Sequence, residues 1–452
     1  MKKGLILGVA AVAALASGVA SAAEVKTGGY YMFRAANYDN TTVLVDTSDA
    51  TNAYFQRLQL NVDMMASAKS HAHLVTRVID NSSVQGADQR VTNAASVTAP
   101  GTVAAGQGDW AINQLWMETE AWGVGVKAGN MPISLNDRIL VNHDTLSFGG
   151  LLLSKTFGDV TGVLAHVKVS EEAIGGASAN TAGMGASDDD TDLIVLSLLG
   201  KSGTVNYQAT GAYMDASKDS DTAAGFARTD ANSGSDNWWG ALTVGSKVAG
   251  IDLTGTAIYE AGWDNNARTT AANMQADDSG WLAALRLKGA AGVGEWNAYG
   301  FYASQGFNNI IDGEQGWSPT WDMSGPGSID MMKLISKDTA AGGGMNNAGM
   351  SQNIWGVGAG LKVKAGAWTI NPNIDYAAIV DKDPGNTGAV TSDFSSMWGG
   401  TLIASTEIDT GVVFALEGGY LDPKYAANRT DATNAGSDKE LHFLSASMKL
   451  SF

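Results

Sequence analysis

Segments with a side-chain period of two recur along the chain, and tight turns alternate with long polar loops between them. Residues 367–376 carry apolar side chains at every second position and polar side chains between them. In residues 355–364 apolar positions alternate with glycine and lysine, and only Ala365 and Gly366 separate the two segments. A period of two is that of a β-strand, so the pair predicts a β-hairpin. About ten residues is also the length that a tilted strand needs to cross a bilayer.

The connections constrain the fold more than any single strand does. A short turn follows one strand and a long polar segment follows the next, in regular order. The short turns lie near residues 158, 202, 249 and 410, and the long segments are 80–108, 170–190, 215–235, 263–279, 304–351, 381–395 and 422–438. A soluble sandwich has no reason to gather every long loop at one end, whereas outer-membrane barrels have tight periplasmic turns and long outer loops.

We therefore predict an all-β fold, a transmembrane antiparallel up-and-down β-barrel. Counting hairpins gives about 18 strands between Gly29 and Phe452. The strands at 148–157 and 160–169 are the least regular, and without this pair about 16 strands would remain. A barrel of this size encloses water rather than a packed core.

The first residues indicate the compartment. Two lysines precede an apolar stretch, and residues 20–22, Ala-Ser-Ala, form a small-residue cleavage site. This is the arrangement of a secretory signal peptide. We expect residues 1–22 to be removed and residues 23–452 to form the barrel. The apolar run is shorter than the roughly 20 residues that a membrane anchor needs.

The composition excludes several classes of function. The formal net charge of −18 repels nucleic acid and attracts cations. The absence of cysteine excludes disulfides and thiolate–metal sites. The sequence contains no nucleophile elbow, no His-Glu-x-x-His motif and no phosphate-binding loop. We therefore expect neither catalysis nor a cofactor.

Tryptophans gather at the ends of the expected strands. One set opens strands that follow long loops: Trp110, Trp238, Trp239, Trp281, Trp355 and Trp398. A second set opens strands that follow short turns: Trp122, Trp296 and Trp368. Amphipathic rings prefer the membrane–water interface, so the two sets predict two aromatic belts.

The last strand carries a family resemblance. One of its faces presents Leu444, Ala446, Met448, Leu450 and Phe452, and the other presents Ser445, Ser447, Lys449 and Ser451. Alternate apolar residues that close on a terminal Phe resemble the C-terminal signature of bacterial outer-membrane barrels. With the loop order and the signal peptide, the mature chain resembles the Gram-negative outer-membrane general porins over nearly its whole length. The resemblance implies a passive pore, a homotrimer, and contact with outer-membrane lipid and lipopolysaccharide.

The same resemblance places a constriction inside the barrel. In these porins the third loop folds into the lumen and carries acids that face a basic wall, and residues 131–146 occupy its position here. The matching constriction candidates are Asp137, Arg138, His143 and Asp144. The matching wall candidates, on the polar faces of the first three strands, are Arg34, Arg57 and Arg77. The competing interpretation is that Arg138 and Asp144 only pin the loop to the wall.

Two further polar clusters invite a metal-site interpretation. Asp188, Asp190 and Asp192 offer hard oxygen ligands that could collect Ca²⁺ or join lipopolysaccharide neighbours through divalent ions. A solvated loop is the competing interpretation, because the Gly and the distant Glu of an EF-hand loop are missing. His71 and His73 share one strand face, and we interpret them as structural or solvated.

We predict a porin that passes ions and small hydrophilic solutes, with a mild cation preference from its net charge. A substrate-specific channel is the alternative within transport and would need an aromatic track along the lumen, for which Tyr299 and Phe301 are inward candidates. A surface adhesin and a barrel sheath around an electron-transfer partner are alternatives from other classes. The sheath would need a wide lumen without a constriction loop.

Overall fold

The computed structural model describes residues 24–39, 51–84, 111–170, 191–216, 236–261, 279–292, 294–304, 307, 311–312, 353–380, 394–425 and 440–452. The expected signal peptide lies outside these residues. The strands are β1 (Glu24–Asp39), β2 (Thr51–Ser67), β3 (Ser70–Val84), β4 (Ala111–Ala121), β5 (Val124–Leu135), β6 (Val141–Phe157), β7 (Val160–Ser170), β8 (Thr191–Ser202), β9 (Val205–Ala216), β10 (Asp236–Val248), β11 (Ile251–Ala261), β12 (Ser279–Ala291), β13 (Gly294–Ala303), β14 (Ile311–Asp312), β15 (Ile354–Ala365), β16 (Trp368–Ile379), β17 (Phe394–Asp409), β18 (Val412–Tyr425) and β19 (Leu441–Ser451).

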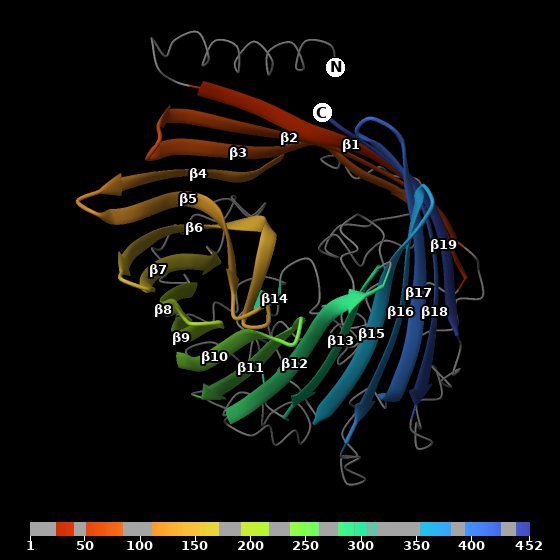
Figure 1. Ribbon diagram of the computed structural model, residues 1–452. Helices are drawn as coiled ribbons and strands as arrows, with labels where there is room; N and C mark the ends of the chain where they lie inside the picture. Colours follow the sequence, from red (N-terminus) through yellow and green to blue (C-terminus); the bar gives the residue numbers. More distant parts are fainter. Residues whose placement is uncertain are drawn as a thin grey trace, which may run out of the picture.

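Eighteen strands, all except β14, form one closed antiparallel wall in the described part of the chain. Each wall strand pairs with its neighbours in the chain, and β1 pairs with β19 to close the barrel (Figure 1). Closure reaches the last residue, because Gly29 N–H donates to Phe452 O at 2.9 Å and Phe452 N–H donates to Gly29 O at 3.1 Å. A closed wall leaves no unpaired strand edge, which a bilayer would penalise. The predicted fold and strand number are confirmed, and the uncertain pair is β6 and β7.

Side chains alternate across the wall, and many of the outward ones are large and apolar. On β8, Val195 is 2% exposed, whereas its neighbours Ile194 and Leu196 are 46% and 56% exposed. The same outward exposure of large apolar side chains holds at Leu402 on β17 and Leu416 on β18. Apolar surface on this scale is unfavourable in water and is matched by lipid. No helix among the described residues is long and apolar enough to cross a membrane.

Aromatic side chains pair along the long-loop end of the wall. The pairs, with their ring-centroid separations, are Tyr213–Trp238 at 4.3 Å, Trp281–Tyr302 at 4.8 Å, Trp355–Tyr376 at 5.3 Å and Trp398–Tyr420 at 4.9 Å. At the opposite end Trp368 lies 6.3 Å from Phe414. Trp239 was wrongly expected in this belt: it is 3% exposed, because Trp238 faces outward and its neighbour must face inward. Trp110 lies outside the described residues.

The β5–β6 hairpin bends away from the wall into the barrel (Figure 1). The cause is an irregular register, in which Met131 pairs with Phe148 but Ile133 pairs with His143. Unequal lengths between paired positions make a bulge, and a bulge bends a strand. The short strand β14 lies beside this hairpin and pairs in parallel with Val141 and Asn142. The segment expected as a loop at 131–146 is therefore largely a hairpin with a turn at 136–140.

Candidate functional site

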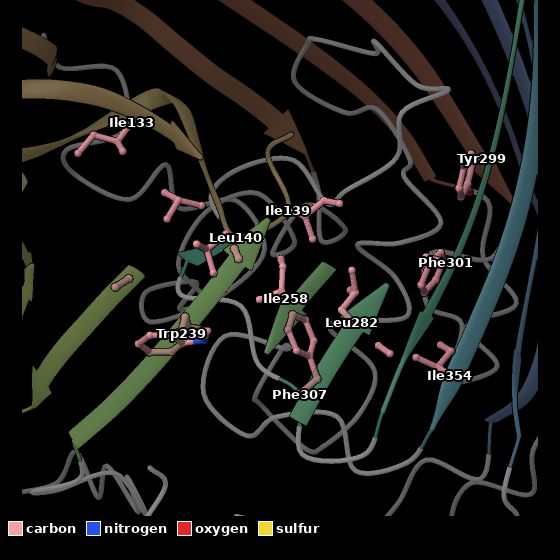
Figure 2. Packing of buried hydrophobic residues seen from close by; sticks show 14 of the residues in the cluster. Ile133, Ile139, Leu140, Trp239, Ile258, Leu282, Tyr299, Phe301, Phe307 and Ile354 are labelled. Carbon is pink, nitrogen blue, oxygen red and sulfur yellow. The ribbon is translucent and has the colours of Figure 1, made fainter. Parts of the chain in front are cut away.

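Apolar packing attaches the inward hairpin to one side of the barrel. Leu140 is fully buried and Ile139 is 3% exposed, and both belong to a cluster with Ile258 and Leu282 from the inner faces of β11 and β12. Figure 2 shows the hairpin side chains above this part of the wall, with Phe307 beneath. Full burial of one such side chain contributes about 1.5–3 kcal/mol. The inner wall is apolar where the hairpin rests on it.

The tip of the hairpin has an unusual backbone that two wall strands hold. Asn136, Asp137 and Arg138 have φ values of 51°, 58° and 66°, in the left-handed region that L-residues rarely occupy in succession. Asn136 N–H donates to Gln208 Oε1 at 3.2 Å, and Asn136 Nδ2 donates to Thr243 Oγ1 at 3.2 Å. These bonds to β9 and β10 offset the backbone cost and fix the direction in which the tip points.

Asp137 forms an ion pair with Arg286 of β12, and Arg286 Nη2 donates to Asp137 Oδ1. Asp137 lies in the turn, outside the wall strands. Burial raises the pKa of Asp137 above its ordinary value, although the neighbouring guanidinium of Arg286 acts in the opposite direction. A carboxylate of the tip and a guanidinium of the wall therefore meet inside the barrel. Arg138, the next tip residue, is exposed.

The three arginines expected on the basic wall belong to β1, β2 and β3, and they are not the described partners of Asp137. Arg34 is buried on β1 and pairs with Glu417 of β18 at 2.8 Å, so its charge is compensated within the wall. Arg77 is buried on β3, and Arg57 on β2 is half-buried.

The residue that sequence reasoning missed is Arg286. Its signal was present, because Arg286 lies on the polar face of its strand. No local pattern, however, shows which strand an inward hairpin will reach. For the other constriction candidates, the backbone of His143 pairs with Ile133, and the side chains of His143 and Asp144 lie outside the described part of the structure.

The expected metal ligands are not brought together in the described residues. Asp192 on β8 contacts His166 at 3.2 Å, while Asp188 and Asp190 lie outside the described residues. No group of three His, Asp or Glu side chains within the described ranges could hold a metal ion. His73 contacts Asp63 and packs on Trp116, with the ring centroids 5.1 Å apart. Its contacts fit the structural interpretation.

Tyr299 and Phe301 point inward from β13, as expected, and are each 6% exposed. Their rings are stacked, with centroids 6.5 Å apart and planes 13° apart. Tyr299 Oη donates to Asp375 of β16 at 2.7 Å. This stacked aromatic pair therefore belongs to the strand next to Arg286, since Arg286 and Tyr299 are directly paired across β12 and β13.

Comparison with known proteins places the fold. No protein-family model matches the sequence, and no curated protein matches it significantly. The chain is similar in structure to OccK8 (OprE) of Pseudomonas aeruginosa, with a TM-score of 0.53, 11% identity and coverage of 95% of this chain and 98% of that one. It is similar to OccAB2 of Acinetobacter baumannii, with a TM-score of 0.51, 10% identity and coverage of 94% and 98%. It is also similar to Pseudomonas aeruginosa OpdK, solved with vanillate, with a TM-score of 0.51, 11% identity and coverage of 94% and 99%.

These similar structures are outer-membrane porins of Gram-negative bacteria, and they are channels rather than enzymes. At such low identity the likeness shows a shared fold. The chain has the closed 18-stranded barrel of these porins. That fold agrees with the outer-membrane location expected from the sequence.

Proposed function

We propose that this chain is an outer-membrane channel that passes ions and small hydrophilic solutes through a lumen narrowed by the β5–β6 hairpin. The observation that carries the proposal is the hairpin tip inside a closed barrel, where Asp137 meets Arg286. Apolar side chains face outward and polar ones line much of the interior, as a water-filled pore in lipid requires.

The distribution of polarity indicates where water would pass. The hairpin packs on apolar inner surface at β10–β12, which contributes Trp239, Ile258 and Leu282. The inner faces of β1 and β18 instead carry the buried pair Arg34 and Glu417. Because ions need polar lining, we expect the path to run between the hairpin tip and the polar side of the wall.

We propose a mild cation preference on this path. The formal net charge is −18, and two ion pairs inside the barrel, Asp137–Arg286 and Arg34–Glu417, are each internally balanced. The unbalanced charge of the chain is negative, so cations should be concentrated at the mouth. We also propose that the barrel acts without a cofactor or catalysis and contacts lipopolysaccharide, and that it forms a homotrimer.

A substrate-specific channel is the second candidate, and one observation favours it. The stacked Tyr299 and Phe301 rings belong to β13, where Tyr299 is directly paired with Arg286 of β12. An aromatic face beside a cation suits a small organic solute that carries a carboxylate. OpdK, which shares the fold, was solved with vanillate. The inward hairpin weighs against a sheath around an electron-transfer partner, which would need the lumen free.

Planar-bilayer recording of the purified barrel tests the proposal. We expect stepwise ohmic currents and a reversal potential in a salt gradient that favours cations. Small sugars should pass into proteoliposomes if the pore is general. If the channel is specific, micromolar to millimolar aromatic carboxylates should instead block the current. A reconstituted, folded barrel that carries no current and admits no solute would refute both candidates.

A further inference from the structure

Three glycines form a strip without side chains on the inner face of β15. Gly356, Gly358 and Gly360 occupy the inward positions of this strand, and the residues between them face outward. Each glycine is directly paired with a larger side chain on β13, and the pairs are Phe301–Gly356, Tyr299–Gly358 and Asn297–Gly360. The absence of three consecutive inward side chains leaves a strip of bare backbone on the wall.

The side chains of both flanking strands lie over this strip. A Cβ atom at Gly356 would stand 2.9 Å from Phe301 Cζ, and one at Gly360 would stand 2.7 Å from Asn297 Oδ1. At Gly358 a Cβ would overlap the Asp375 carboxylate and lie 2.8 Å from Tyr299 Cζ. Real Cβ atoms essentially never approach other atoms so closely, so these positions are filled by neighbouring side chains.

Tyr299 uses the strip to cross β15. Its hydroxyl donates to Asp375 Oδ1 at 2.7 Å, although β13 and β16 are separated by the whole of β15. Two strand spacings amount to about 10 Å, so the ring must lie flat along the wall to reach. A side chain at residue 358 would block this route, because Gly358 is directly paired with both Tyr299 and Asp375.

The flat ring also affects the constriction. Arg286, Tyr299, Gly358 and Asp375 form one row across β12, β13, β15 and β16. At one end of this row, Tyr299 donates a hydrogen bond to Asp375. At the other end, Arg286 pairs with Asp137 of the hairpin tip. The tyrosine ring therefore extends along the wall toward Asp375, away from the guanidinium that holds the tip.

We propose that Gly358 is a positioning residue for the pore, because it allows Tyr299 to lie against the wall and leaves Arg286 to hold the hairpin tip. This inference rests on the proposed channel function. A methyl group at residue 358 would displace the ring toward the barrel interior and weaken its bond to Asp375. The displaced ring would then enter the space beside Asp137 and Arg286.

The test compares Gly358→Ala with Gly240→Ala. Gly240 is also a strand glycine, but it faces outward and an added Cβ meets nothing within 4 Å. We expect Gly358→Ala to lower single-channel conductance roughly twofold, because one ring would enter a narrow throat. The variant should also exclude neutral polymers that are small enough to enter the wild-type pore. Gly240→Ala should leave both unchanged. Adding Tyr299→Ala to Gly358→Ala should restore conductance to at least the wild-type level.

A second readout does not depend on conduction. The unfolding midpoints of Gly358→Ala, Tyr299→Ala and the double variant form a mutant cycle, in which the double variant should be more stable than the sum of the single effects. Additive midpoints, or a Gly358→Ala channel with wild-type conductance and polymer exclusion, would overturn the positioning role. A double variant as restricted as Gly358→Ala alone would do so too. A barrel with a coupled cycle and no current would refute the channel function and leave the contact between the two residues established.

Discussion

Neutralising Asp137 should shift the ion preference of the pore in a direction that the ion pair dictates. In the wild type, Asp137 and Arg286 cancel each other at the hairpin tip. Asp137→Asn keeps the size of the side chain and leaves the guanidinium uncompensated. The throat therefore gains one positive charge, and the cation preference should fall.

The magnitude follows from Coulomb's law. A unit charge about 7 Å from a permeant ion in water contributes about 0.6 kcal/mol, close to the thermal energy. The local cation concentration should then fall about threefold at low salt. At 0.1 M salt the screening length is about 10 Å, which reduces the energy by about half and the change to about 1.5-fold.

Reversal potentials in salt gradients, recorded at two ionic strengths, measure this shift. Arg286→Gln should change the preference in the opposite direction, and the double variant should return near the wild type because the charges balance again. Asp159→Asn removes an acid in the exposed turn between β6 and β7, and it serves as the matched control. The reasoning fails if Asp137→Asn and Asp159→Asn give the same potential, or if the double variant does not compensate.

Three further outcomes are expected. Because burial raises the pKa of Asp137, its protonation on acidification should begin above the usual aspartate range of about 3.9, so cation preference should fall as pH falls; recordings of Asp137→Asn should lack this step. Arg34→Gln leaves Glu417 buried without its partner and should cost about 3–5 kcal/mol, seen as a lower unfolding midpoint in guanidinium, whereas adding Glu417→Gln should recover part of the loss. Leu416→Arg places a charge on the lipid face and should cost about 2–4 kcal/mol near the bilayer midplane, while Ala415→Arg on the lumen face should be tolerated; equal unfolding midpoints for these two would contradict the assigned faces.

The sequence determined the architecture because the barrel is specified by local patterns. In each strand the period of two distinguishes an apolar face from a polar face, as in residues 367–376. The order of short and long connections distinguishes the two ends of the barrel. The irregular pair that left the strand number open became β6 and β7, which pair with each other and with β5 and β8 in the wall. The sequence alone could have corrected the expectation for Trp239, because adjacent residues on a strand, here Trp238 and Trp239, cannot both face the lipid.

Only the tertiary structure decided which groups meet inside the barrel. The family resemblance placed Asp137 on an inward segment, but its partner Arg286 is far away in the chain and on a strand that is not adjacent to β5 or β6. That meeting depends on where the bulge between Met131 and Ile133 directs the hairpin. It also depends on the apolar inner surface that receives Ile139 and Leu140. Periodicity fixes the direction of a side chain relative to its own strand, whereas contacts across a lumen depend on closure, curvature and packing of distant segments.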